Sequence, residues 1–207
     1  MTIVQALIAF LGVAAVVVVT PGLDVAMVLR ASAVGGGRGG AHAAAGITLG
    51  CLIWGATVSV GLGALLAASE LAFAIVRWAG AAYLTWMGLK LIVRPRQAFE
   101  GLPAGLGSPN PGEWLRRGLL TNLLNPKIAV FFISFLPQFV PAGANVALFS
   151  FLLAAIYAAM GALWFAVLIA ATLPLSRALR RPNVVKLMDR LTGGVFVAFG
   201  ARLALSR

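Results

Sequence analysis

The chain has 207 residues, of which 61% are hydrophobic and only 10% are charged. Soluble domains usually contain about 45–50% apolar and about 25% charged residues, and a soluble fold of this size exposes too much surface to hide so large an apolar excess. The net charge of +11 could indicate a nucleic-acid-binding protein. The basic residues, however, stand in short stretches between apolar runs, as the topology signals of membrane proteins do. Composition therefore predicts a protein of the lipid bilayer and argues against nucleic acid as a partner.

The first apolar run covers Ile3–Val19 and has no lysine or arginine in front of it. A secretory signal needs a basic start and a small-residue cleavage site, and neither is clear here. We therefore expect this run to be a permanent first span.

Helices that cross a bilayer need about 20 mostly apolar residues, and on that measure the sequence predicts an all-α membrane protein with six transmembrane helices. We expect them at about residues 3–29, 41–66, 71–93, 117–137, 146–173 and 184–205, with a short loop between the first and the second. The connection over residues 94–116 is rich in proline and glycine, which predicts an irregular cytosolic loop. No second domain is indicated.

The basic residues gather in alternate connections between these helices. The intervening connections, near residues 67–70 and 138–145, contain no lysine or arginine. By the positive-inside rule, the basic connections lie in the cytosol and both termini lie outside. The residues that determine this orientation are Arg30, Arg38, Lys90, Arg94, Arg96, Arg116, Arg117, Arg177, Arg180, Arg181, Lys186 and Arg190.

Residues 1–93 and 117–207 have related patterns. The first helix of each unit is interrupted by a proline, at Thr20-Pro21-Gly22 and at Asn125-Pro126-Lys127. Three helices per unit is an odd number, so the second unit must enter the membrane from the opposite side. We therefore predict a single transporter domain of two inverted three-helix repeats with helices 1 and 4 interrupted, because many secondary transporters bind their substrates at such paired breaks. The alternative is a chance similarity between helices rich in glycine and alanine.

Two charged residues stand beside these breaks and within the predicted spans. Asp24 follows Pro21 and Gly22, and Lys127 follows Pro126 near the middle of the fourth span. A charge at the centre of a span costs about 2.5–3.5 kcal/mol, so such residues usually face a protein interior or a wet cavity. A free amino acid is a zwitterion, and a carboxylate and an ammonium on paired broken helices complement both of its charges. The pattern therefore predicts a binding site for a small zwitterion.

The prolines add to such a site, because each lacks an N–H and leaves carbonyl groups of the preceding turn free to meet a ligand. The predicted substrate-binding residues are Thr20, Pro21, Gly22, Asp24, Asn122, Asn125, Pro126 and Lys127, with Thr121 as a further hydrogen-bonding neighbour. Two alternatives stay open. Asp24 and Lys127 could form a buried pair that only stabilises the contact between helices 1 and 4, and Asp24 could line the cytosolic entrance instead of the middle of the membrane.

The sequence contains one cysteine, Cys51, and one histidine, His42. A single cysteine excludes an internal disulfide and a CxxC redox pair. One cysteine and one histidine are also too few to form a cluster of metal ligands. We expect Cys51 to be a small apolar residue of a helix and His42 to lie at the surface. No glycine-rich phosphate-binding motif is present, so ATP-driven transport is not supported. We therefore expect a protein that needs no cofactor or metal and is not an enzyme.

The motif Gly46-x-x-x-Gly50 in the second predicted helix favours close helix packing, as do Gly80, Gly88, Gly193 and Gly200. We expect these contacts within one subunit. The alternative is an interface between two copies in a homodimer.

Several motifs occur in order along the first four predicted helices. They are Thr20-Pro21-Gly22-Leu23-Asp24, Gly36-Gly37-Arg38-Gly39-Gly40, Gly46-x-x-x-Gly50, Gly80-Ala81-Ala82-Tyr83-Leu84, Thr121-Asn122-Leu123-Leu124-Asn125-Pro126-Lys127, Phe131-Phe132 and Pro137-Gln138-Phe139. As an ordered set they resemble the LysE/RhtB family of bacterial amino-acid exporters, and the resemblance covers nearly the whole chain. Leu23 stands where that family usually has a second proline, which implies a less sharply bent first helix here.

The resemblance implies a secondary transporter of the bacterial inner membrane that exports amino acids or similar small metabolites from the cytoplasm. It also implies that the proton motive force drives this export, by exchange with protons. The competing hypotheses are transport of another solute, a metal- or redox-handling membrane protein of the same fold group, and a scaffold that transports nothing. A site for lysine or arginine would want a second carboxylate besides Asp24, so we expect neutral or small polar substrates.

Overall fold

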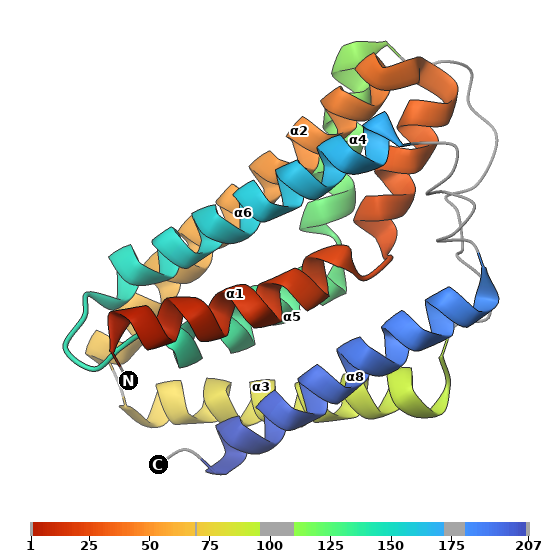
Figure 1. The fold of residues 1–207 in the computed structure, drawn as a ribbon. Coiled ribbons are helices and arrows are strands. Elements are labelled where there is room, and N and C mark those ends of the chain that lie inside the picture. The colour runs from red at the N-terminus through yellow and green to blue at the C-terminus, as the bar shows by residue number, and fades with distance from the viewer. Residues whose placement is uncertain (1, 69, 96–109, 172–180, 206–207) are drawn as a thin grey trace.

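The computed structural model describes residues 2–68, 70–95, 110–171 and 181–205, and in these ranges it contains helices and no strand. Figure 1 shows long helices that lie along one another, with both ends of the chain at the same end of the molecule.

The first predicted span is interrupted at Pro21, as expected. Helix α1 (Ile3–Val19) begins with a capping box, in which the Thr2 hydroxyl accepts a hydrogen bond from the Gln5 N–H and the Gln5 side chain accepts one from the Thr2 N–H. The helix ends because Pro21 disfavours a helical conformation at the residue before it, and Thr20 is extended. Helix α2 (Leu23–Ala68) then begins on the other side of the break.

The predicted loop near residues 30–40 is wrong. Helix α2 is helical through this stretch and reverses direction at Gly36 alone, where φ is 64° and ψ is −167°. Glycine adopts this conformation without strain because it has no Cβ. Figure 1 shows the two arms of α2 diverging from this turn, and we call residues 23–35 its first arm and residues 37–68 its second arm. Next to the turn the arms touch, since a Cβ at Gly39 would lie 2.6 Å from the carbonyl oxygen of Ala31.

The fourth predicted span is interrupted as well. Helices α4 (Pro111–Leu123) and α5 (Pro126–Phe135) are bent by 53° at their junction, and a short 3-10 helix, η1 (Leu136–Phe139), continues α5. The predicted loop over residues 94–116 extends too far, because α4 begins at Pro111. Asn110 starts this helix by accepting a hydrogen bond from the Glu113 N–H at 2.9 Å, and proline suits the first helical position.

Helices α3 (Glu70–Val93) and α8 (Pro182–Leu205) form a pair, which Figure 1 shows below the other helices. Their backbones approach closely: a Cβ at Gly88 would lie 2.6 Å from the carbonyl oxygen of Gly193, and a Cβ at Gly193 would lie 2.6 Å from that of Gly88. A Cβ at Gly200 would overlap the Thr85 hydroxyl. The prediction that these glycines serve packing within one subunit is confirmed, while the surroundings of Gly80 lie outside the described residues.

The second arm of α2 packs against α4 and against helix α6 (Val146–Ala170). The contact with α4 depends on glycines from both sides, because a Cβ at Gly46 would overlap the carbonyl group of Leu115 and a Cβ at Gly118 would overlap that of Ala43. Gly46 and Gly50 therefore pack within the chain, as predicted.

An aromatic cluster joins α5 to α6. The ring of Tyr157 on α6 lies 4.8 Å from that of Phe131 and 5.4 Å from that of Phe132, measured between centroids. Phe10 of α1 lies 5.4 Å from Phe139 of η1 in an edge-to-face arrangement, which aromatic pairs favour. These buried rings hold the two interrupted spans against α6.

Among the described residues, two helices are long and apolar enough to cross a membrane, Leu23–Gly61 and Val146–Ala170. The bent pair of Pro111–Leu123 and Pro126–Phe139 makes a third if it is one span, and Ile3–Val19 and Ala81–Val93 are shorter apolar helices. The molecule is thus a helical membrane protein. Its division into six spans stays a prediction.

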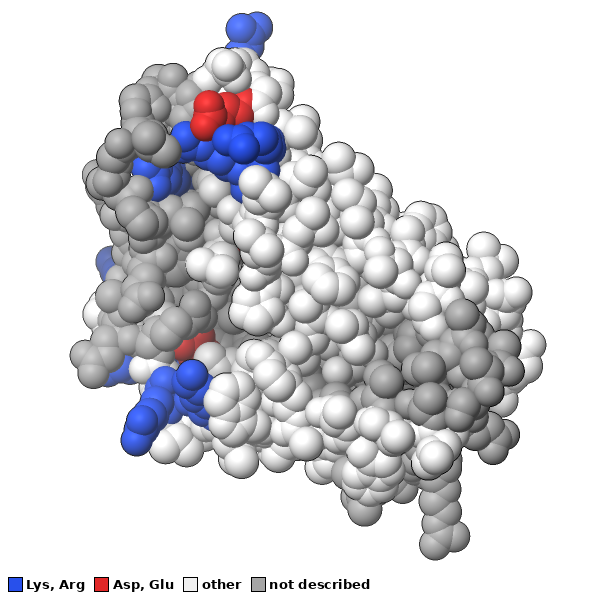
Figure 2. Space-filling model, turned by 180° about the vertical axis from the view of Figure 1, so that it is seen from behind, with Lys and Arg blue, Asp and Glu red and all other residues white. Residues whose placement is uncertain are grey.

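The basic side chains are distributed unevenly over the surface. Figure 2 shows the lysine and arginine side chains of one face gathered at one end of the molecule. Glu113 lies among them and pairs with Arg117 at 2.7 Å and with Arg116 at 3.6 Å. Figure 1 shows both termini at the opposite end.

Because a Cβ at Gly118 would overlap the Ala43 carbonyl, we expect Gly118→Ala to push α4 away from the second arm of α2. Overpacking of this kind costs about 1–3 kcal/mol, so the thermal unfolding midpoint of the purified protein in detergent should fall. Gly12→Ala is the matched control, since a Cβ at this helical position meets nothing within 4 Å. An unchanged midpoint for Gly118→Ala would contradict the close contact.

Candidate functional site

The two helix breaks meet through Lys127. Its ammonium donates hydrogen bonds to the carbonyl oxygens of Val17 and Thr20, at 3.2 Å each. In an unbroken helix the Val17 carbonyl would bond to the N–H of residue 21, but Pro21 has none. Lys127 therefore satisfies a carbonyl that the proline leaves without its helical partner, and its positive charge suits the negative end of α1.

Gly22 and Asn125 shape the surroundings of this lysine. A Cβ at Gly22 would lie 3.3 Å from Lys127 Nζ, so glycine leaves room for the ammonium. Asn125 is the N-cap of α5, and its side-chain oxygen accepts a hydrogen bond from the Lys127 N–H at 3.1 Å. Pro126, at the first position of α5, cannot donate a hydrogen bond and starts the new helix direction.

Asp24 lies on the other side of the first break, in the first turn of α2, where the helix N-terminus favours a carboxylate. Asn122 of α4 donates a hydrogen bond to Asp24 Oδ2 at 2.9 Å, and its amide nitrogen also lies 3.4 Å from the Cys51 sulfur. Asn122 thus connects α4 with both arms of α2. The Asn122 side chain also packs directly against Gly50, since a Cβ at Gly50 would lie 2.6 Å from Asn122 Oδ1.

Three buried polar atoms at the breaks have no hydrogen-bond partner within 3.5 Å among the described residues, although the side chains of Asn125 and Asp24 also interact with each other. The three atoms are Asp24 Oδ1, Asn122 Oδ1 and Asn125 Nδ2. Buried polar groups in proteins are normally paired, because leaving one unpaired costs about 1–3 kcal/mol. The site therefore offers acceptors and a donor to a ligand.

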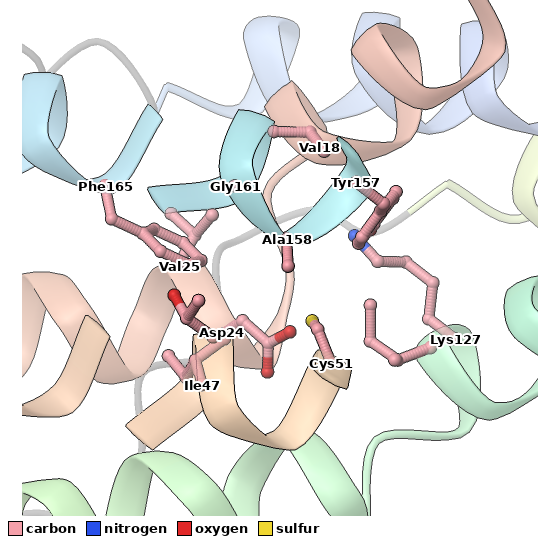
Figure 3. A pocket seen from close by; sticks show the side chains of 12 residues that line it. Val18, Asp24, Val25, Ile47, Cys51, Lys127, Tyr157, Ala158, Gly161 and Phe165 are labelled. Carbon is pink, nitrogen blue, oxygen red and sulfur yellow. The ribbon is translucent and has the colours of Figure 1, made fainter. Parts of the chain in front are cut away.

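A small cavity of about 20 Å³ lies between Asp24 and Lys127. Ligand pockets usually measure about 300–1,000 Å³, whereas this cavity holds about one water, so a substrate must widen the pocket to bind there. Figure 3 shows the Asp24 carboxylate near Cys51 in the middle of the view, with Lys127 and Tyr157 to one side and Phe165 and Val25 to the other. The pocket therefore has a charged side and an apolar side.

The charges of Asp24 and Lys127 attract each other across this pocket. The attraction is stronger than it would be in water, because Asp24 is only 8% exposed and the interior has a low dielectric constant. Each charge also has hydrogen-bond partners of its own, Asn122 for the carboxylate and the end of α1 for the ammonium. Burial disfavours the charge of Asp24, and the attraction to Lys127 together with these hydrogen bonds offsets part of that cost.

The structure brings most of the predicted site residues together. Asp24 and Lys127 line the pocket, Asn122 and Asn125 flank it, and Pro21, Gly22 and Pro126 form the breaks. Thr20 is engaged elsewhere: its hydroxyl donates to the Val16 carbonyl at 2.6 Å and pairs with Thr192 of α8.

Sequence reasoning missed the wall that α6 supplies. Tyr157, Ala158, Gly161 and Phe165 line the pocket at helical spacing, and Cys51, which we expected to be an ordinary apolar residue, lines it as well. Spacing of three or four residues would have indicated that these α6 residues share a face. Nothing in the sequence indicated that this face borders a pocket. No group of three or more His, Cys, Asp and Glu residues in the described ranges could hold a metal ion.

Comparison with known proteins gives one family match. Residues 15–207 match the model of the LysE type translocator family. The chain is 32% identical to a leucine efflux protein of Enterobacter sp. (strain 638) and 32% identical to a homoserine/homoserine lactone efflux protein of Salmonella typhi, in each case over 91% of this chain and 90% of the relative. It is 25% identical to the uncharacterized membrane protein YrhP of Bacillus subtilis (strain 168), over 98% of this chain and all of the relative. No solved structure matches the chain.

Because Lys127 holds the end of α1, we expect Lys127→Met to lower the thermal unfolding midpoint. Methionine has a similar shape but no donor, and a hydrogen bond to a charged group contributes about 1.5–3 kcal/mol. Lys186→Met, at a half-buried position on α8, is the matched control and should change the midpoint less. Equal midpoints for the two variants would show that the contact with α1 does not stabilise the fold.

Proposed function

The chain belongs to the LysE type translocator family, and on that premise we propose that it is an inner-membrane secondary transporter that exports amino acids from the cytoplasm. The observation that carries the proposal is the pocket between the two helix breaks, with a carboxylate and an ammonium facing it. Relatives named as leucine and homoserine efflux proteins support an amino acid as the substrate.

We assign the ends of the substrate by charge. The α-ammonium group would bind at Asp24, whose carboxylate lines the pocket, and the α-carboxylate would bind on the side of Lys127. Asn122 Oδ1 and Asn125 Nδ2 offer further hydrogen bonds, with Thr20, Pro21, Gly22 and Pro126 keeping the breaks open. Among the residues that the structure describes, the carboxylate of Asp24 is the only one lining the pocket, which favours neutral over basic amino acids.

We propose that the chain forms one transporter domain with six spans, in which residues 1–93 and 117–207 are inverted three-helix repeats. Each repeat begins with a broken span, α1 with the first arm of α2 in one and α4 with α5 in the other. The helices that would correspond to each other also pack in pairs, the second arm of α2 against α6 and α3 against α8. Such paired breaks near the membrane centre are where secondary transporters bind substrates.

For orientation, we place the basic end in the cytoplasm and both termini outside. The support is the gathering of lysine and arginine at one end and of both termini at the other. Arg77, Arg202 and Arg207 stand outside the basic connections, and the rule concerns the balance of lysine and arginine, so single exceptions do not reverse it.

A scaffold that transports nothing is the second candidate, because the hydrogen bonds of Asp24 and Lys127 also join α4 to α2 and α5 to α1. The two candidates differ in whether the charge of Asp24 is needed for export. We expect Asp24→Asn, which keeps the shape but removes the charge, to reduce export of labelled leucine and threonine from preloaded cells at least about tenfold, as loss of a charged hydrogen bond predicts.

Glu113→Gln is the matched control for that experiment, since Glu113 pairs with arginines at the surface and does not line the pocket. It should export at the rate of the unmodified protein. A folded Asp24→Asn protein with an unchanged export rate would remove Asp24 from the mechanism and favour the scaffold.

We further propose that the proton motive force drives export by exchange with protons, with Asp24 as the carboxyl group placed to take up a proton when the substrate leaves. A protonophore should then collapse the outward accumulation of a labelled amino acid in preloaded cells to that of cells without the protein. Accumulation that persists while ATP and sodium gradients are held constant would reject proton coupling.

A further inference from the structure

Gly161 is a buried glycine in the middle of α6, and it lines the pocket. A glycine inside a helix costs about 1 kcal/mol relative to alanine, so the packing around it should explain its presence. A Cβ built at Gly161 would meet only the Phe165 ring, at 3.9 Å. That is an ordinary contact, so the protein itself would tolerate a larger side chain here.

Four glycines at the contacts between these helices behave differently. A Cβ at Gly46, Gly55 or Gly118 would overlap a neighbouring helix, and one at Gly50 would lie 2.6 Å from Asn122. Those glycines are required by helix packing. Gly161 is not, and the space that its missing side chain leaves belongs to the pocket.

The position of this space fits the side chain of a substrate. Figure 3 shows Gly161 on the α6 segment above Asp24, with Phe165 and Val25 toward one side and Lys127 toward the other. A zwitterion bound by Asp24 and Lys127 would therefore direct its side chain toward Phe165, Val25 and Ile47, which are apolar and line the pocket. Within the described ranges, no charged residue besides Asp24 and Lys127 lines it.

From this geometry we propose that Gly161 determines which substrates fit, and that the substrates are neutral amino acids with an apolar side chain, up to the size that the space beside Gly161 admits. This inference rests on the proposed export function. In a pocket widened around the substrate, a branched apolar side chain would lie beside Gly161, and a methyl group there would compete with it directly. A small side chain such as that of alanine does not reach this space.

The test compares Gly161→Ala and Gly161→Val with the unmodified protein in cells preloaded with labelled alanine, valine, leucine or lysine. Rates are divided by the amount of folded protein, measured by size-exclusion chromatography of detergent extracts. One methylene group in an apolar pocket changes specificity by about ten-fold or more. Gly161→Ala should therefore lower the ratio of leucine to alanine export by about ten-fold, and Gly161→Val should also exclude valine. Lysine should be exported poorly by all variants.

Gly12→Ala is the matched control, because it makes the same change on α1 where a Cβ meets nothing within 4 Å, away from the pocket. Its ratio of leucine to alanine export should stay unchanged. A folded Gly161→Ala protein with an unchanged ratio, or with equal loss of both amino acids, would overturn the inference and leave export itself standing. If the unmodified protein exports none of the amino acids and none raises its unfolding midpoint, the proposed function fails instead.

Phe165→Leu provides a second test that does not require the glycine variants to fold. Replacing the ring shortens the apolar wall opposite Lys127, so the ratio of phenylalanine to leucine export should rise. An unchanged ratio would overturn the placement of the side chain between Gly161 and Phe165.

Discussion

The hydrogen bond from Lys127 to the Val17 carbonyl is the interaction on which the centre of this molecule depends. Pro21 deprives that carbonyl of its helical partner, and in a low-dielectric interior an unpaired carbonyl is costly. The lysine that repairs this defect comes from the matching break in another span, and its own charge would be costly alone. The hydrogen bond thus pairs the unpaired carbonyl of Val17 with the buried ammonium of Lys127, and each group lowers the cost of burying the other. It also holds the N-terminus of α5 at the end of α1.

Asn122 has the corresponding role for the carboxylate. It holds Asp24 from α4 and contacts Cys51 on the second arm of α2, so one side chain connects three helical segments. With the charges held by separate partners, a molecule that carries both signs can bind between them when the pocket widens. Buried charges of this kind are screened by salt much less than surface charges are, so their attraction for a zwitterion persists at physiological ionic strength.

The helix breaks and the charges beside them were predictable from sequence, because the missing N–H of proline and the cost of a charge in a bilayer are local properties. The turn at Gly36 was not. A run of glycines around Arg38 is typical of a loop, and it forms a helix here because Gly35 and Gly39 leave room for the Trp114 ring, whose Nε1 would lie 2.8 Å and 3.2 Å from their Cβ positions. The places of Cys51 and Gly161 in the pocket wall were not predictable either, since only the packing of α2 on α6 decides which helix face borders the pocket.

The reversal of α2 at one residue also has a mechanical consequence. Asp24 stands on the first arm and Cys51 on the second, and no slack chain separates the arms. The arms cannot slide past each other, because Gly39 abuts Ala31 beside the turn. A widening of the pocket that keeps both arms helical and in contact beside the turn is a scissor-like rotation about Gly36, in which a small change of its backbone angles moves the far ends of both arms the most.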